Sequence, residues 1–147
     1  MTTRISVLVD SSFLFALNSP NDNNRLNALR VANAGVGRYL IPEIVLAETA
    51  YMLRQRIGQR AVTSFLDVLS KSAMELQPLT KADVQRAREI MEAYAASDFD
   101  LADCCIMALS ERLNINHICT FDERDFRQYR PQHVPYLTLF PADLPKA

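Results

Sequence analysis

The stretch Ile5-Ser6-Val7-Leu8-Val9-Asp10 decides the fold, because a mainly apolar run of strand-forming residues ends directly on a carboxylate. Such a run predicts a buried strand that leaves its sheet at the acid. Four later runs have a similar composition, at residues 39–41, 74–79, 115–120 and 136–140, and helical periodicity fills most of the sequence between them. This alternation predicts an α/β sandwich whose central sheet of about five strands is mainly parallel.

Proline, glycine and capping residues predict where the helices begin and end. Pro42 suits the first turn of a helix, and Gly58 separates that helix from the next, which predicts a helical hairpin. Thr80 begins a further helix, with Asp83 three positions on as a variant of the capping box. The predicted helices cover residues 25–34, 42–57, 59–70, 80–96 and 100–114.

Composition limits the class of protein. A chain of 147 residues with 49% hydrophobic content is predicted to form one domain over residues 1–147. A formal net charge of −1 excludes a protein that holds nucleic acid through a global positive field. Without a signal-peptide pattern or a run of ~20 apolar residues, we expect a cytoplasmic protein with no membrane partner. The three cysteines lack zinc-site spacing and are predicted to be small buried hydrophobes.

Four acids recur beside apolar sequence at points far apart in the chain. Asp10 ends the first predicted strand, Asp122 follows the fourth, and Asp103 lies in the first turn of the helix before that strand. Because sites in open parallel sheets form at the carboxyl ends of strands, these three acids should share one edge. Glu48 lies in mid-helix, beside the face that packs on the sheet. Converging buried carboxylates need a neutralising partner, and a divalent cation meets that need.

Each acid taken alone also has a purely structural interpretation. Asp10 and Asp122 could cap loops, Asp103 could complement a helix dipole, and Glu48 could face water. The occurrence of all four where strand ends meet helix starts favours a shared site. Asp100 is either the cap of the helix that carries Asp103 or an auxiliary metal ligand, and we favour the cap.

The order and spacing of four motifs resemble the PIN domain, and in particular the small toxin nucleases of VapBC toxin–antitoxin pairs. The resemblance spans nearly the whole chain. The motifs are Val9-Asp10-Ser11-Ser12, Glu48 in the second-helix segment, Leu101-Ala102-Asp103 at a helix start, and Thr120-Phe121-Asp122-Glu123-Arg124-Asp125-Phe126.

The resemblance implies a three-layer α/β/α fold, a Mg²⁺ or Mn²⁺ site, and endonucleolytic cleavage of RNA by the toxin of a toxin–antitoxin pair. Its partners would be an RNA substrate and a small antitoxin protein. The catalytic and metal-binding quartet would be Asp10, Glu48, Asp103 and Asp122. Ser11 or Ser12 matches the small polar position after the first acid, where many relatives carry Asn, and Thr120 matches a hydroxyl two residues before the last acid.

The residue types fit that chemistry independently of the resemblance. Phosphodiester hydrolysis needs an acidified water and charge compensation on the leaving oxygen, and bound metal ions supply both. An all-carboxylate set suits Mg²⁺ better than zinc. His117 is predicted to be structural and His133 to be a surface-loop residue.

The residues after Asp122 complete the predicted site. Asp125 and Phe126 are expected to fix a loop after the fourth strand, with Phe126 packed inward. Asp125 is expected at most to contact the metal ligands, not the metal itself. Arg124 and Arg127 rank highest among the arginines that could meet RNA phosphates, because they follow Asp122.

Other classes of protein are less consistent with the sequence. A phosphatase of the haloacid dehalogenase type needs a second acid where this chain has Ser12, and a receiver domain needs an acidic pair at the end of the first strand. Two alternatives share the PIN fold: an RNA-processing nuclease outside a toxin–antitoxin system, and a catalytically silent binding module. The silent module would be expected to have lost some of the acids.

The predicted hairpin of residues 42–70 carries more apolar positions than one sheet face needs. This predicts a homodimer, with further burial when an antitoxin segment docks in an apolar groove. The hairpin is the candidate for part of that groove, through Leu46, Ala50, Leu53 and Phe65, which could equally belong to the core or to the dimer interface.

Overall fold

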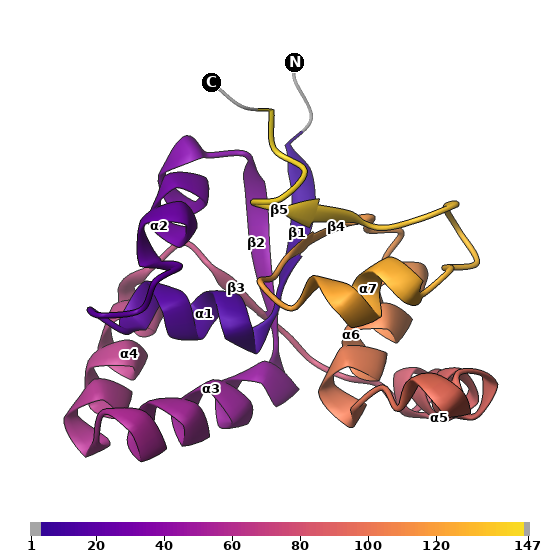
Figure 1. The fold of residues 1–147 in the computed structure, drawn as a ribbon, viewed down its shortest axis with the longest axis horizontal. Coiled ribbons are helices and arrows are strands. Elements are labelled where there is room, and N and C mark those ends of the chain that lie inside the picture. Colours follow the sequence, from indigo (N-terminus) through magenta and orange to yellow (C-terminus); the bar gives the residue numbers. More distant parts are fainter. Residues whose placement is uncertain (1–3, 146–147) are drawn as a thin grey trace.

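Five parallel strands form one sheet at the centre of the computed structural model, which describes residues 4–145 (Figure 1). The strands lie in the order β3-β2-β1-β4-β5, so the apolar β1 occupies the middle of the sheet. Every pairing is parallel, and the predicted sheet is confirmed. The strand bounds are β1 Ile5–Val9, β2 Gly37–Pro42, β3 Glu75–Gln77, β4 His117–Cys119 and β5 Thr138–Phe140.

Helices cover both faces of the sheet and give the three layers that the resemblance implied (Figure 1). Right-handed crossovers place α1 to α4 on one face and α5 to α7 on the other, because the strand order changes direction after β3. The change puts a switch point at the carboxyl ends of β1 and β4. The helix bounds are α1 Ser11–Asn18, α2 Arg25–Ala34, α3 Glu43–Arg56, α4 Gln59–Lys71, α5 Lys81–Ala93, α6 Leu101–Arg112 and α7 Glu123–Gln128.

Three segments differ from the sequence-based expectation. The sequence does not predict α1, because its centre is apolar on all sides and lacks an amphipathic stripe. The segment after β4, expected to be a loop, is the short helix α7, although Phe126 is fully buried as predicted. The helix expected over residues 80–96 ends at Ala93 and is followed by the 3₁₀ turn η1, Ala95–Ser97.

The helix α6 is the most deeply buried helix of the described chain, since residues 102–110 are all buried. It carries Cys104 and Cys105, which are free and buried like Cys119 in β4, as predicted for small hydrophobes. Within residues 4–145, no helix has the length and apolar character needed to cross a membrane.

Ion pairs between α5 and α6 hold the helix that carries Asp103. Arg112 on α6 donates to both oxygens of Asp83 on α5, at 2.8 and 3.0 Å. Asp83 is 1% exposed and also forms the predicted capping box with Thr80. A second pair joins Arg86 Nε to Glu111 Oε1 at 2.7 Å. These charge-assisted bonds fix α6 against α5 and therefore fix the position of its first turn.

Candidate metal centre

Asp10 follows β1 and is almost completely buried, with 2% of its surface exposed. Its Oδ2 accepts hydrogen bonds from Thr120 Oγ1 at 2.8 Å and from Ser12 Oγ at 2.9 Å. Its Oδ1 has no hydrogen-bond partner among the described residues. Burial raises the pKa of Asp10 to about 6, against the opposing effect of the two hydroxyl donors. This carboxylate therefore keeps one buried oxygen that a cation would stabilise.

Asp103 lies in the first turn of α6 and is 3% exposed. Its Oδ2 is also buried without a partner in the part of the chain that the structure describes. The pKa of Asp103 is raised to about 9, first by burial and then by the negative charges of Asp10, Asp100, Asp122 and Asp125. In the absence of a cation, Asp103 is therefore protonated at neutral pH.

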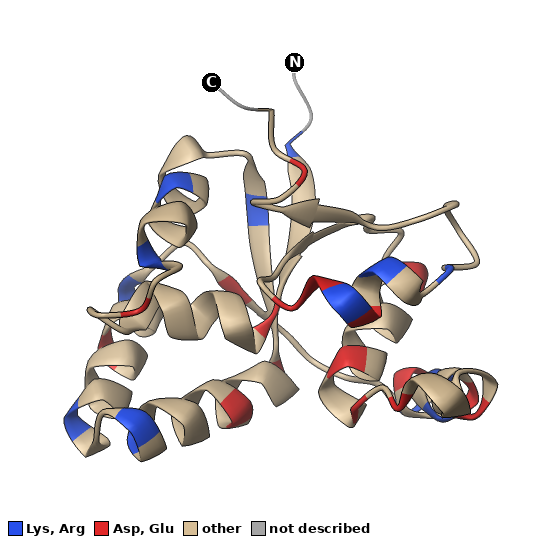
Figure 2. Cartoon of the chain, viewed as in Figure 1, with Lys and Arg blue, Asp and Glu red and all other residues tan. Residues whose placement is uncertain are grey.

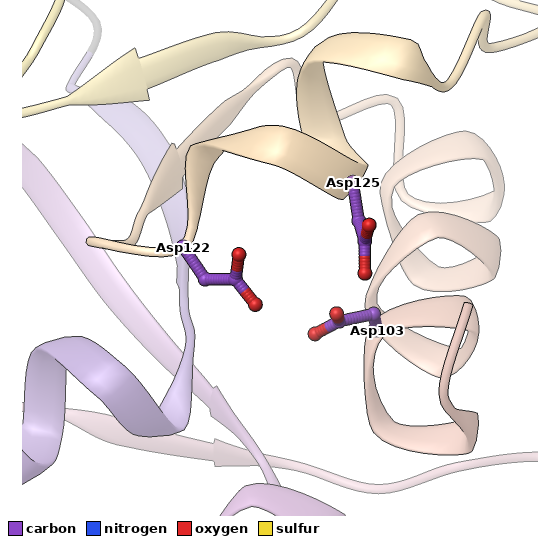
Figure 3. A group of neighbouring side chains, drawn as sticks. All are labelled: Asp103, Asp122 and Asp125. Carbon is purple, nitrogen blue, oxygen red and sulfur yellow. The ribbon is translucent and has the colours of Figure 1, made fainter. Parts of the chain in front are cut away.

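Asp103, Asp122 and Asp125 each offer one carboxylate oxygen, and these oxygens lie within 4.8 Å of one another. Figure 3 shows the three side chains turned toward one another from α6 and from the start of α7. Burial, followed by the charges of Asp125 and Asp100, raises the pKa of Asp122, while Arg124 opposes the shift. A hard divalent cation is the natural partner for oxygen donors this close together.

Asp125 belongs to this group although the sequence suggested at most a supporting role. The available signal is the spacing Asp122-x-x-Asp125, which places the N-cap and the first turn of α7 on the same side of a helix. The spacing is informative only if the segment is helical, and the sequence favours a loop there.

Hydroxyl groups tie the end of β1 to the segment after β4. Thr120 Oγ1, which donates to Asp10, also accepts the backbone N–H of Asp122 at 3.0 Å. Ser12 Oγ likewise donates to Asp10 and accepts the backbone N–H of Phe121 at 3.0 Å. Two hydroxyls therefore set the position of Asp10 relative to Asp122.

Glu48 lies in the middle of α3 and is half-buried. It accepts a hydrogen bond from Ser11 Oγ at the start of α1, and its charge contributes to the raised pKa of Asp10. Glu48 therefore faces the same region as the other predicted acids. Neither Glu48 nor Asp10 belongs to the closest group, which consists of Asp103, Asp122 and Asp125.

Asp100 is the N-cap of α6, as favoured from the sequence, since its Oδ1 accepts the backbone N–H of Asp103 at 2.8 Å. Of the two arginines ranked highest for RNA, Arg127 donates to Asp143 at 2.7 and 2.9 Å and to Glu123 at 3.1 Å. The guanidinium of Arg127 is therefore already bonded to carboxylates, which leaves it less suited to contact RNA phosphates. Arg124 is exposed and close enough to Asp122 to affect its pKa, which suits contact with a phosphate.

Neither histidine takes part in the acidic group. The ring of His117 packs against that of Phe140, with centroids 5.3 Å apart, which agrees with a structural role. His133, expected on the surface, is half-buried, and its Nε2 lies 2.9 Å from the carbonyl oxygen of Ile115.

Figure 2 shows how the acidic and basic residues are distributed over the fold. Acids gather where β1 ends and where α6 and α7 begin, and basic residues lie on α2, near the end of α3 and on α4, as well as on α5 and on α7 beside the acids. The site offers only oxygen donors, and two of its buried oxygens are unpartnered within residues 4–145. This donor set fits a hard divalent cation better than a soft one.

Several known proteins are similar to this chain in sequence or in fold. Ribonuclease VapC26 of Mycobacterium tuberculosis is 24% identical over 135 residues, which cover 92% of this chain and all of that protein. The crystal structure of VapC20 from the same species, a toxin that cleaves the sarcin-ricin loop, superposes with a TM-score of 0.74 at 22% identity, covering 79% of this chain and 89% of that one.

Two further structures have the same fold at lower identity. VapBC2 from Rickettsia felis, bound to a DNA fragment from its promoter, gives a TM-score of 0.66 at 18% identity, covering 92% of this chain and 97% of that one. A toxin–antitoxin complex from Klebsiella pneumoniae gives a TM-score of 0.63 at 18% identity, covering 89% of this chain and 98% of that one. The family profile described as PIN domain matches residues 7–130. The match covers most of the chain, and it agrees with the parallel sheet and with the acids at the β1–β4 switch point. The chain therefore belongs to the PIN domain family.

Proposed function

We propose that this protein is an endoribonuclease that hydrolyses RNA phosphodiester bonds with Mg²⁺ or Mn²⁺, and that it is the toxin of a toxin–antitoxin pair. One observation carries the proposal: carboxylates from separate elements of a PIN domain converge, and the two buried ones, Asp10 and Asp103, each keep a buried oxygen without a partner in the described chain. The similarity to Ribonuclease VapC26 over that protein's full length supports the choice of RNA as substrate.

The residues proposed to hold the metal are the four acids expected from the sequence, together with Asp125, which the structure adds. Such ions make a bound water more acidic and compensate charge on phosphate oxygens. The hydroxyls of Ser12 and Thr120 keep Asp10 oriented, and Asp100 anchors the first turn of α6. The proposed catalytic residues are Asp10, Glu48, Asp103 and Asp122, with Ser11, Ser12, Thr120 and Arg124 as auxiliary residues.

A covalent mechanism through a protein thiol does not fit the structure. Burial raises the pKa of Cys104 to about 12, and it raises the pKa values of Cys105 and Cys119 as well. A protonated, buried thiol is a poor nucleophile. Attack by water is therefore the proposed route.

The direct test is cleavage of single-stranded RNA by purified protein that has been freed of any partner. Activity with Mg²⁺ or Mn²⁺, loss of activity with EDTA, and products with 5′-phosphate and 3′-hydroxyl ends would support the proposal. Cyclic phosphate products, or cleavage that survives rigorous chelation, would reject it. Complete inactivity with either metal would favour the silent binding module.

The proposed antitoxin has a suitable docking surface between α1, α2 and α4. A groove of about 410 Å³ there is mostly apolar, with Arg25 at one side. Of the hairpin residues suggested by the sequence, Phe65 lines this groove, Leu53 is fully buried in the core, and Leu46 and Ala50 are half-buried. An amphipathic partner segment would cover the apolar lining. The apolar side chains of the groove are Leu14, Leu17, Leu29, Phe65, Val68, Leu69 and Met74.

A further inference from the structure

A second hollow, of about 310 Å³, shares a wall with the acidic site. Asn24, Asn27 and Arg30 line it from the start of α2, and Thr120, Phe121 and Glu123 line it from the segment after β4. Its volume is at the low end of the ~300–1,000 Å³ typical of small-molecule pockets. The hollow is therefore large enough for one flat ring system and too small for several nucleotides.

Thr120 connects this hollow to the acids. Thr120 is one of the residues that line the hollow, and its Oγ1 donates to Asp10 at 2.8 Å and accepts the backbone N–H of Asp122 at 3.0 Å. An RNA chain whose phosphate lies at the acids would therefore place a neighbouring base beside the hollow.

The α2 side of the hollow is formed by regularly spaced polar residues. Asn24, Asn27 and Arg30 are spaced by three residues, which aligns them along one side of the helix, while Ala28 and Val31 face the core. Asn24 is the N-cap residue of α2, yet its side chain makes no capping hydrogen bond. In residues 4–145, no side-chain hydrogen bond or ion pair holds any of the three. Their donors and acceptors are free for a ligand.

The opposite wall offers an aromatic ring. Phe121 stacks on Phe13 with centroids 5.9 Å apart and an interplanar angle of 11°, so its orientation is fixed by the core. Glu123 also lines the hollow and balances the charge of Arg30, so the lining does not select a phosphate over a neutral base. Aromatic rings and arginine planes that stack on unpaired bases, together with amides that bond to base edges, are the usual means of recognising single-stranded RNA.

We propose that this hollow binds an unpaired purine base of the nucleotide next to the cleaved bond. The preference for purines follows from the side chains: an asparagine amide pairs with the N6 and N7 edge of adenine, and an arginine pairs with the O6 and N7 edge of guanine. This inference rests on the proposed nuclease function. It explains which base the nuclease prefers beside the cleaved bond.

The test is cleavage of a random single-stranded RNA library by wild-type protein with Mn²⁺, followed by sequencing of the product ends. Purines should be enriched at one position beside the cut, by roughly tenfold if one good bidentate contact is made. Asn27→Ala and Arg30→Ala should weaken this enrichment and leave the other positions unchanged. Asn33→Ala, an exposed asparagine at the other end of α2, should behave like wild type.

The outcomes separate this inference from the function on which it rests. If wild type cleaves the library without a purine preference beside the cut, or if Asn27→Ala and Arg30→Ala keep the full preference, the base site is wrong and the nuclease stands. If wild type cleaves nothing with Mn²⁺ or Mg²⁺, the nuclease proposal fails and this inference fails with it. Thermal melts of each variant check that these exposed substitutions leave the fold intact.

Discussion

At the scale of single residues, the geometry of the site depends most on Thr120, because one hydroxyl contacts two of the proposed ligand residues. It donates to the Asp10 carboxylate and accepts from the Asp122 backbone, and it is 1% exposed. Side chains that orient metal ligands in this way affect metal affinity without touching the ion.

Thr120→Val keeps the shape of the side chain and removes the hydroxyl. We expect a folded protein whose Mn²⁺ affinity and cleavage rate fall by about 10- to 100-fold, because Asp10 loses its shortest hydrogen bond. The measurement is the cleavage rate as a function of Mn²⁺ concentration. Thr138→Val, at the start of β5, is the matched control and should match wild type. Equal rates for both variants would show that the hydroxyl has no role in the site.

Asp103 makes stability depend on pH when no metal is bound. Its folded pKa of about 9 lies above the ordinary value of 3.8, so the folded state binds a proton that the unfolded chain releases between these two values. The stability due to this proton is therefore complete below the ordinary pKa and is lost as pH rises toward the folded pKa. In EDTA, we expect the free energy of unfolding to fall between about pH 4 and about pH 9, and to fall less steeply in Asp103→Asn.

Urea unfolding of both proteins across that pH range measures the effect. Asparagine resembles the protonated acid and cannot titrate, which is why the slope should flatten. Parallel pH profiles for the two proteins would mean that Asp103 does not carry the raised pKa.

Some residues of the candidate site could be proposed from the sequence and others could not, for a physical reason. Asp10, Asp103 and Asp122 could be predicted because each adjoins the end of a recognisable strand or the start of a helix. Asp125 could not, because its place near the other acids requires α7 to be helical. The contact between Ser11 and Glu48 depends on how α1 lies against α3, which no local pattern encodes.

At the scale of elements, the pairing of α5 with α6 controls where the first turn of α6 lies. The Asp83 carboxylate is buried between the two helices, and burial opposes its charge. Hydrogen bonds from Arg112 and Thr80 outweigh burial and lower the pKa of Asp83.

Arg112→Ala should therefore destabilise the fold, because it leaves a buried carboxylate without its cationic partner. We expect a loss of about 2 to 4 kcal/mol, below the cost for a fully buried pair because Arg112 is partly exposed. Arg88→Ala is the control, since its pair with Glu92 is exposed and should contribute less than about 0.5 kcal/mol. Denaturant unfolding measures both changes, and equal losses in the two variants would contradict a special role for Arg112.

The elements that the sequence predicts best are those with a clear period or a clear cap. Thr80 and Asp83 mark the start of α5, and the capping box is present as predicted. In contrast, α1 is apolar on nearly every side and α7 is short and charged, so neither shows the amphipathic period of a surface helix. Both helices flank the acidic site, and their form is set by packing around it.

At the scale of the whole molecule, the alternation of strands and helices was enough to predict an α/β sandwich with a mainly parallel sheet, and the resemblance to the PIN domain implied the three layers. The strand order was not predictable in the same way, because it depends on which strands pair after each crossover. That order puts Asp10 and Asp122 just beyond the carboxyl ends of two adjacent strands, since β1 pairs directly with β4.

The hairpin of α3 and α4 leaves large apolar side chains exposed: Tyr51 is 66% exposed, Ile57 49% and Leu66 47%. Soluble monomers rarely expose such surface in one region, so we predict a two-fold homodimer. Light scattering at tens of micromolar measures the mass, and Leu66→Glu should weaken the dimer. Leu26→Glu, on α2 outside the hairpin, should leave it intact. A strictly monomeric wild type would remove the dimer prediction and leave the nuclease proposal unaffected.

The measurement that tests the central claim most directly is the thermal melting of wild type and Asp103→Asn in Mn²⁺ and in EDTA. Asp98→Asn is the matched control, an exposed acid in the left-handed region that asparagine tolerates well. If the buried acids form one metal site, Mn²⁺ stabilises wild type and Asp98→Asn by mass action. Asp103→Asn then loses most of that stabilisation, melts in EDTA at or above the wild-type temperature, and does not cleave RNA. An Asp103→Asn protein that is destabilised equally in both buffers and still cleaves RNA would contradict the account.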